Sequence, residues 1–204
     1  MYQPDVAPFA AIDPENSGNV SGIIDLLSTG LGGLTFMQAA PVAVPQGTIP
    51  VLRARGVQMC LEQRLKDIPR NEITALLPKD VPDMLRLVSE TEPGPFFPHT
   101  HLLGTYWGVF EEERLVAMAG ERMRLPGFCE ISAVCVDQAA RGRGLARALV
   151  ARVAKTILAR GETPFLHAYA ENYPAIALYQ SMGFRIRRHM NIVKLARVND
   201  NETA

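Results

Sequence analysis

Hydrophobic residues in the middle of the chain follow the pattern of short strands. Three such runs occupy residues 105–110, 114–124 and 129–136, and the turns EEE and LPGF between them are short. Strands joined by turns of this length predict an antiparallel meander. Before the meander, residues 79–90 carry apolar positions spaced as on one helix face, with Asp80 as the expected N-cap. The pattern therefore predicts a helix followed by three neighbouring strands.

The pattern changes to a helical period after residue 144. Apolar residues now recur every four positions and share one helix face: Leu145, Leu149, Val153 and Ile157. Residues 164–170 form another strand-like run, residues 173–183 a short helix, and residues 184–195 a long closing strand or a bent pair of strands. A strand, a helix and a strand in this order imply a right-handed crossover between parallel strands. We therefore predict a fold that combines helices and strands, α/β in the broad sense, with a mixed sheet of the kind found in α+β proteins.

The N-terminal third gives a weaker pattern. A short helix is expected within residues 21–30. Strand-like runs at residues 36–44 and 48–61 are expected to be broken by Pro45 and Pro50, since proline cannot donate to a strand ladder. No constellation of chemically reactive residues stands out in this part of the chain.

These patterns divide the chain into three parts. Residues 62–72 are polar and charged and read as a linker or loop, so we place a boundary after residue 72. The expected parts are an N-terminal segment (residues 1–72), one domain (residues 73–198) and a polar tail (residues 199–204).

Composition narrows the classes of partner. The 204 residues carry 21 basic and 21 acidic side chains, so the net charge is zero and neither nucleic acid nor an anionic membrane is favoured. Three cysteines without CxxC spacing disfavour a disulfide framework or a metal site, and we expect no metal and a cytoplasmic location. The N-terminus lacks the basic start and apolar core of a signal peptide. The uncharged residues 26–52 are interrupted by glycine and proline, which disfavours a membrane span.

The junction VCVDQAARGRGLARALV (residues 134–150) leads from a predicted strand into a predicted helix. Gly142 and Gly144 stand at the helix start, between Arg141, Arg143 and Arg147. Unpaired N–H groups and the positive end of the helix dipole can hold an anion, and glycine lets the anion approach the backbone. A plain helix start with solvated arginines is the alternative from this pattern alone.

Two motifs together resemble a known family. RGRGLA (residues 141–146) is similar to the [Q/R]-x-x-G-x-[G/A] signature of the GCN5-related N-acetyltransferases (GNAT). About thirty residues later, residues 172–184 are similar to the family's N-x-x-A-x-x-L-Y-x-x-x-G-F pattern. The resemblance spans residues 73–197 and is closest to the FR47-like branch, which includes glycine N-acyltransferase-like proteins. Some of those proteins carry an extra N-terminal half that is a degenerate copy of the same fold, and residues 1–72 could be such a half.

The resemblance implies that the anion is the pyrophosphate of acetyl-CoA or another acyl-CoA. Backbone N–H groups of the RGRGLA motif would hold it: Arg141, Gly142, Arg143, Gly144, Leu145 and Ala146. The main chain of Val134, Cys135 and Val136 would bind the pantetheine arm, where two parallel strands diverge. Asn172 would contact the pantetheine arm, cap the following helix, or do both.

The resemblance also implies where the reacting groups lie. Tyr179 would be the acid that protonates the leaving sulfur, or a packing residue. Glu130 is the first candidate for the base, because strand alternation places it on one face with Val134 and Val136. Glu121, on the neighbouring strand, is the second candidate, unless an arginine pairs with it; water without any side-chain base is the third.

Two further segments could shape the acceptor site. His167 and Tyr169 alternate along one strand and could line a pocket, although a lone histidine in a strand is commonly structural. The loop PGPFFPHTHLLG could form a wall with side chains that also simply pack: Phe96, Phe97, His99 and His101.

The sequence therefore favours an enzyme that moves an acetyl or acyl group from acetyl-CoA to a primary amine. The expected partners are acyl-CoA and a small-molecule or peptide amine. Formation of a homodimer is compatible with the sequence but is not predicted by it. A catalytically silent acyl-CoA-binding regulatory domain is the alternative. A nucleic-acid-binding protein is disfavoured by the neutral net charge and by the lack of aromatic residues among the arginines.

Overall fold

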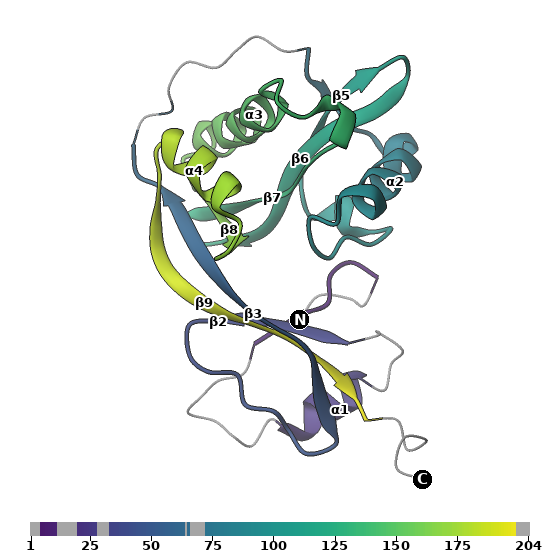
Figure 1. Ribbon diagram of the computed structural model, residues 1–204, viewed down its shortest axis with the longest axis vertical. Helices are drawn as coiled ribbons and strands as arrows, with labels where there is room; N and C mark the ends of the chain where they lie inside the picture. The colour runs from purple at the N-terminus through teal and green to yellow at the C-terminus, as the bar shows by residue number, and fades with distance from the viewer. Residues whose placement is uncertain (1–4, 12–19, 28–32, 64, 66–71, 199–204) are drawn as a thin grey trace.

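The computed structural model describes residues 5–11, 20–27, 33–63, 65 and 72–198. These residues build one nine-stranded mixed sheet in the order β1-β2-β9-β3-β8-β7-β6-β5-β4 (Figure 1). Its strands are β1 (Phe9–Ala10), β2 (Leu34–Gln38), β3 (Thr48–Leu61), β4 (Thr74–Ala75), β5 (Tyr106–Glu111), β6 (Arg114–Leu125), β7 (Phe128–Val136), β8 (Thr163–Tyr169) and β9 (Phe184–Arg197). The predicted α/β fold with a mixed sheet is confirmed.

Four α-helices and three described 3-10 helices accompany the sheet. They are α1 (Val20–Leu27), η2 (Pro78–Asp80), α2 (Val81–Thr91), η3 (Thr100–Leu103), η4 (Gln138–Ala140), α3 (Leu145–Ala159) and α4 (Tyr173–Ser181). The helices α3 and α4 cover one face of the sheet and α2 covers the other (Figure 1). Asp80 precedes α2 as expected, but its carboxylate accepts a hydrogen bond from the Leu77 amide and does not cap α2.

The central part of the sheet has the predicted topology. Strands β5, β6 and β7 form an antiparallel meander, and β7 pairs with β8 in parallel after the α3 crossover. The face toward α3 and α4 holds the largest core cluster, in which Leu149, Val153 and Ile157 of α3 are fully buried. The four-residue spacing that predicted α3 therefore marks the side of the helix that packs on the sheet.

The long strand β3 lies in the middle of the sheet, although it belongs to the N-terminal third of the chain. It pairs antiparallel with both β8 and β9. The expected break at Pro50 does not occur, because the strand continues through a register shift between Pro50 and Leu52 that accommodates the missing N–H. Strand β9 is likewise one long strand rather than a pair. The origin of residues 1–72 as a second copy of the fold stays a prediction.

The outer strands β1 and β2 continue the sheet beyond β9, and α1 packs against them. Ile23 and Leu27 of α1 join Phe36 of β2 and Val193 of β9 in a second apolar cluster. The predicted tail at residues 199–204 and most of the predicted linker at residues 62–72 lie outside the described residues.

Candidate functional site

The RGRG turn (residues 141–144) has the conformation expected of an anion-binding helix start. Gly142 and Gly144 both have φ of 78°, in the left-handed region, and a Cβ added at either residue would meet open space. In the described part of the chain, the N–H groups of residues 142–147 donate no hydrogen bond; the first helical bond runs from Ala148 N to Gly144 O, at 3.1 Å. These free, unshielded donors fit an anionic group such as a pyrophosphate.

The arginines around the RGRG turn are held by neighbouring groups. Arg143 forms an ion pair with Glu111, and Arg147 donates to Ser181 Oγ at 2.6 Å. Arg141 Nε lies 3.4 Å from the Val136 carbonyl oxygen. The crowded positive charge is therefore partly balanced within the protein, and the backbone amides remain as the open donors.

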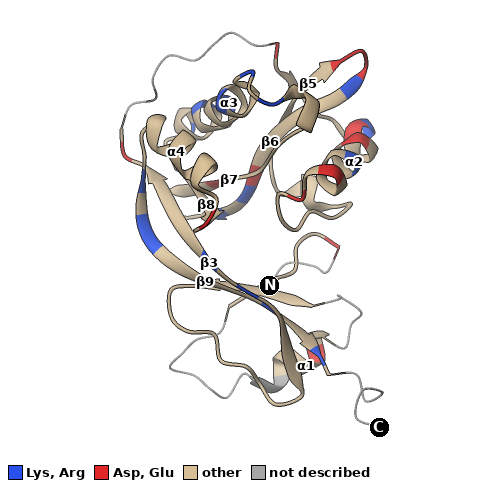
Figure 2. Cartoon of the chain, in the orientation of Figure 1, with Lys and Arg blue, Asp and Glu red and all other residues tan. Residues whose placement is uncertain are grey.

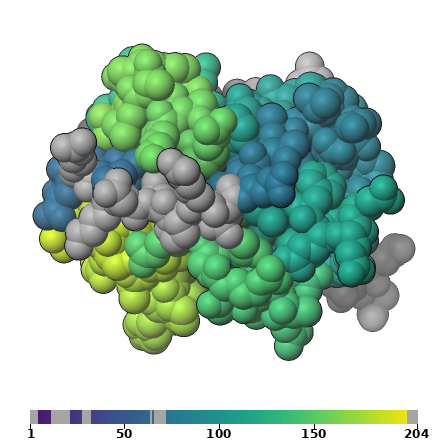
Figure 3. Space-filling model, turned by 90° about the horizontal axis from the view of Figure 1, so that it is seen from above, coloured from purple at the N-terminus to yellow at the C-terminus, as the bar shows by residue number. Residues whose placement is uncertain are grey.

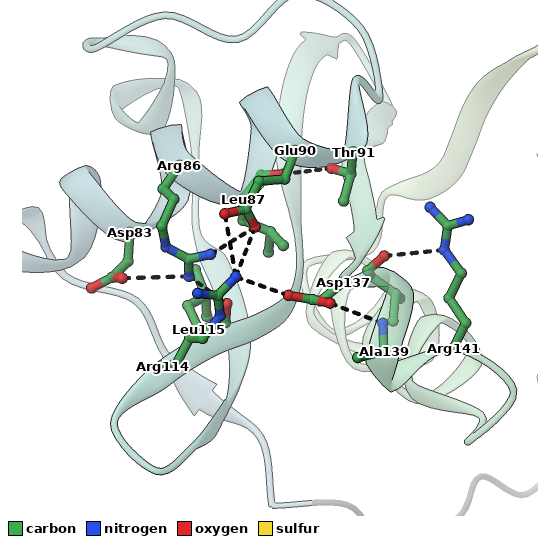
Figure 4. Close-up of polar contacts among 11 residues, drawn as sticks. Asp83, Arg86, Leu87, Glu90, Thr91, Arg114, Leu115, Asp137, Ala139 and Arg141 are labelled. Atoms are coloured by element: carbon green, nitrogen blue, oxygen red, sulfur yellow. Dashed lines mark hydrogen bonds and ion pairs between the residues drawn. The ribbon is translucent and has the colours of Figure 1, made fainter.

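A network of ion pairs fixes the segment that leads into the RGRG turn. The Asp137 carboxylate accepts from the Ala139 amide at 2.9 Å and from Arg114 at 3.1 Å (Figure 4). The hydrogen bond from the Ala139 amide and the contact with Arg114 lower the Asp137 pKa. Arg114 also reaches Glu90 of α2, at 3.0 Å, so it joins α2 and β6 to the end of β7.

The surface around this network carries charges of both signs. Figure 2 shows acidic and basic residues together on α2, and basic residues along α3. Seen from above in Figure 3, the teal residues of α2 and of the β5–β6 region adjoin the green residues that follow them in sequence.

Strands β7 and β8 diverge next to the RGRG turn. Their parallel pairing runs from Phe128 and Thr163 to Ile131 and Leu166, and the remainder of both strands is unpaired with each other. We call the opening between these unpaired ends the split. It lies at the carboxyl ends of two parallel strands, where open α/β sheets place their ligands.

A bulge in β7 changes which face of the sheet the side chains after it point to. Ala133 has φ of 50°, and the pairing with β6 shifts register between Met118 and Gly120. Val134 and Val136 therefore pack toward α3, with Ile131, whereas Cys135 packs toward α2. Glu130 precedes the bulge and points away from α3, so the expectation that it shares a face with Val134 and Val136 is wrong.

Glu130 is fully buried and bound on all sides. Its Oε1 lies 2.6 Å from Arg122 Nη2 and 2.8 Å from His167 Nδ1, and its Oε2 lies 2.8 Å from Arg122 Nε. Burial alone would raise the Glu130 pKa, but the attraction and hydrogen bonds of Arg122, with those of His167, outweigh it and lower the pKa to about 2. Glu130 is thus an anion at neutral pH and, by itself, a weak base.

His167 connects Glu130 to a second polar side chain. Its Nε2 lies 3.2 Å from Gln58 Nε2, and Gln58 Oε1 accepts from Arg187 at 2.8 Å. Because Arg187 fixes the Gln58 amide with its NH2 group toward the ring, His167 Nε2 is the acceptor and Nδ1–H is donated to Glu130. The ring is therefore oriented by a buried carboxylate, with Nδ1 toward Glu130 and Nε2 toward Gln58.

Glu121 lies on the opposite face of the sheet from Glu130. It is paired in register with Ile131, is 1% exposed, and forms ion pairs with Arg124 at 3.1 Å and Arg160 at 2.9 Å. Arg160 follows the last residue of α3, so Glu121 ties the end of that helix to β6. Glu121 and Glu130 were the two candidate side-chain bases expected at one cleft, whereas the structure places them on opposite faces of the sheet.

The predicted helix after β8 carries the other two candidate residues. Asn172 Oδ1 accepts from the Ala175 amide at 3.2 Å and caps α4. Tyr179 packs against Phe184 with ring centroids 6.2 Å apart and is 7% exposed. Burial, with a smaller effect of Cys135, raises the Tyr179 pKa to about 12, so its hydroxyl keeps its proton at neutral pH.

Tyr106 of β5 is a further residue of interest, and nothing in the sequence marks it as a candidate. Its ring packs against Phe96 and lies over Gly120, and its buried hydroxyl has no hydrogen-bond partner among the described residues. Burial raises its pKa, and Glu130 and Cys135 are near enough to affect it. Only a tertiary structure can identify such an unpaired hydroxyl, because the strand sequence TYWGVF carries no motif. In the same loop as Phe96, His99 pairs with Asp5 and His101 with the Pro98 carbonyl.

Neither a metal-binding cluster nor a membrane-spanning helix is found among the described residues. The described residues contain no group of three or more histidine, cysteine, aspartate or glutamate side chains that could hold a metal ion. None of the described helices has the length and apolar character needed to cross a bilayer.

Comparison with known proteins gives a consistent result. Residues 106–193 match the family model described as FR47-like protein. A crystal structure from Novosphingobium aromaticivorans, assigned to the GNAT acetyltransferase family, is 41% identical, with 96% of this chain and 86% of that chain covered and a TM-score of 0.88. The ribosomal-protein-S18-alanine N-acetyltransferase of Escherichia coli shares the fold, with 22% identity over 65% of this chain and 98% of that chain and a TM-score of 0.52. Among curated proteins, the N-alpha-acetyltransferase RimI of Mycobacterium tuberculosis is 37% identical over 91 residues, 43% of this chain and about half (54%) of that relative.

Proposed function

Since this chain belongs to the GNAT acetyltransferase family and its FR47-like branch, we propose that it transfers an acetyl group from acetyl-CoA to a primary amine. The observation that carries this proposal is the RGRG turn, whose two left-handed glycines expose free amides beside the split. Helix starts of this kind bind phosphate groups. The two motifs that matched the family thus lie on the two sides of one opening.

In this proposal the chain binds its co-substrate through main-chain groups. The amides of Arg141 to Ala146 hold the pyrophosphate, and the edge of β7 that is no longer paired with β8 beyond Ile131, at Val134 to Val136, presents its main chain to the pantetheine arm. Asn172 contributes by capping α4, which fixes Tyr179. The side chains of Val134 and Val136 pack in the core and are not needed for binding.

The transfer requires one proton to leave the amine and one to reach the sulfur. The neutral amine nitrogen bonds to the carbonyl carbon and the carbon–sulfur bond breaks; the nitrogen gives up one proton and the sulfur takes up one, so the products are an amide and free CoA thiol. Tyr179 is protonated at neutral pH and serves as the donor to the sulfur. Glu130 is enclosed and acts as a positioning residue: it holds His167, whose Nε2 receives the amine proton, directly or through water, when this donor replaces the Gln58 NH2 group at Nε2.

The proposed location and domain organisation follow the same reasoning. All three cysteines are free thiols, which fits a reducing compartment, and we propose a cytoplasmic enzyme. We propose residues 73–198 as the acetyltransferase domain, with β3 of the N-terminal segment completing its sheet between β8 and β9.

The test is release of free thiol from acetyl-CoA across a panel of primary amines. The panel should hold alkylamines, arylalkylamines, polyamines, amino acids and short peptides with free N-termini, and mass spectrometry should identify the acetylated product. Acetylation of at least one amine with one thiol released per product is expected. Tight CoA binding without turnover on any amine would instead support the catalytically silent acyl-CoA-binding domain.

Replacement of Tyr179 by phenylalanine should slow turnover without weakening CoA binding. Loss of a positioned acid typically costs about 100- to 10,000-fold in kcat, and the ring would still pack against Phe184. The measurements are kcat for the best amine and the Kd of CoA by calorimetry.

Tyr173→Phe is the matched control, because Tyr173 lies on the same helix with 72% of its surface exposed. It should keep the wild-type kcat. An unchanged kcat in Tyr179→Phe would rule out the acid role and leave Tyr179 as a packing residue.

A further inference from the structure

A cavity of about 880 Å³ is lined by the N-terminal elements and by central strands of the sheet. Its walls come from β1, α1 and β2 on one side, and from β3, β6, β8 and β9 on the other. The lining residues are Phe9, Ala10, Ala11, Gly22, Ile23, Leu26, Met37, Gln58, Met123, Leu125, Phe165, His167 and Met190. A cavity of this size is on the scale that holds small-molecule ligands.

The lining of the cavity is almost entirely apolar. Among the thirteen residues only Gln58 and His167 carry polar side chains, and none is an aspartate, glutamate, lysine or arginine. Such a lining stabilises the apolar part of a ligand. Apart from Gln58 and His167, it offers no partner to a polar or charged group. The occupant therefore has a hydrophobic body with one polar group.

The polar side chains mark the end of the cavity nearest the split. His167 directly follows Leu166, the last β8 residue paired with β7. Phe165 and His167 line the cavity, whereas Leu166 and Ala168 between and beyond them pack toward α3 and α4. The cavity therefore lies on the face of the sheet opposite α3, and His167 in its wall is one residue beyond the last β7–β8 pair, where the split begins.

We propose that this cavity binds the acceptor, and that the acceptor is a primary amine carrying a hydrophobic alkyl or arylalkyl group. This inference rests on the proposed acetyl transfer. The amine lies at Gln58 and His167, and the hydrophobic group extends toward Met37 and Met190. A long acyl chain that entered by the same end would place methylene groups against the hydrogen-bonding atoms of Gln58 and His167. An amine can form hydrogen bonds with these atoms, so the cavity favours the amine over the acyl chain.

The test is a series of straight-chain amines from ethylamine to hexylamine. In calorimetry with the protein saturated by CoA, where no transfer can occur, each added CH2 should tighten binding about fourfold, until the chain fills the cavity. With saturating acetyl-CoA, kcat/KM should rise in the same order. A flat series in both measurements would overturn the proposal.

Variants on one helix provide the matched comparison. Leu26→Asn places an amide in the cavity wall and should reduce the gain per CH2 to about twofold or less, whereas Asp25→Asn, on the exposed side of α1, should leave the series unchanged. Ala10→Phe, which fills part of the cavity from β1, should cut binding of hexylamine at least tenfold more than that of ethylamine. An equal loss for both amines in Ala10→Phe, or an unaltered series in both cavity variants, would contradict the assignment.

The outcome separates this inference from the function on which it rests. Chain-length-dependent binding without thiol release would sustain the cavity assignment and refute acetyl transfer to these amines. Thiol release with a flat amine series would sustain the proposed function and overturn the cavity assignment. A flat amine series combined with a preference for hexanoyl-CoA over acetyl-CoA would assign the cavity to the acyl chain and likewise overturn it.

Discussion

Replacing Gly144 by valine is expected to weaken CoA binding about 100-fold. At φ of 78° a β-branched residue costs on the order of 1–3 kcal/mol of strain. The turn can relieve this strain only by turning the amides of the RGRG turn away from a common anion. In addition, the new side chain would occupy the open space through which the anion approaches. The Kd of CoA, measured by calorimetry, checks this expectation.

Gly161→Val is the matched control for this substitution. Gly161 has φ of 75°, and an added Cβ also meets open space, but it lies just beyond the C-terminal end of α3. Its valine variant should lose a similar free energy of unfolding while keeping the wild-type CoA affinity. If Gly144→Val bound CoA as tightly as Gly161→Val does, the RGRG turn would not be the pyrophosphate site.

Glu130→Gln is expected to have the largest effect on stability. It removes the negative charge that Arg122 contacts, and the Arg122 side chain is only 9% exposed. Removing one partner of a buried ion pair typically costs about 3–5 kcal/mol. If the variant folds, it should also change the pH dependence of kcat/KM, because His167 loses the anion that holds its Nδ1–H. Urea unfolding and the pH–rate profile measure the two effects.

The comparison variant is Glu121→Gln, on the opposite face of the sheet. Glu121 is as buried as Glu130, but its partners Arg124 and Arg160 are 52% and 32% exposed and remain solvated when the charge is lost. A smaller loss, about 1–2 kcal/mol, is expected, with an unchanged pH–rate profile. A shifted profile in Glu121→Gln and a normal one in Glu130→Gln would identify Glu121 as the group that acts on the amine.

The Glu130 pKa also predicts acid sensitivity. Its value falls from an ordinary 4.5 to about 2 on folding, so the folded state holds the proton less tightly than the unfolded state. The resulting stability, about 3 kcal/mol, is fully present above about pH 5 and is lost as the pH falls from 4.5 toward 2. The free energy of unfolding, measured from pH 7 to pH 2.5, should show this loss, and Glu130→Gln should remove it.

Much of the site was predictable because its local parts are encoded locally. The two glycines of RGRG specify left-handed backbone at a helix start, and Asn172 three residues before Ala175 specifies a helix cap. Other contacts were not predictable. Arg122 follows Glu121 in the sequence, but it pairs with Glu130, which lies on the neighbouring strand β7. The reason is that successive side chains of a strand point to opposite faces, so Arg122 cannot share the face of Glu121.

The sequence by itself determined the periodic elements, the mixed sheet and the glycine-rich helix start, since each depends on residues within one or two turns of one another. The tertiary structure alone decided which side chains meet. The bulge at Ala133 contains no glycine from which it could be predicted, yet it places Glu130 on a different face of the sheet from Val134 and Val136. The cavity joins Phe9 to Met190, which are far apart in the chain. Sheet register and packing between distant segments set these contacts, and neither is written in the periodicity of any single segment.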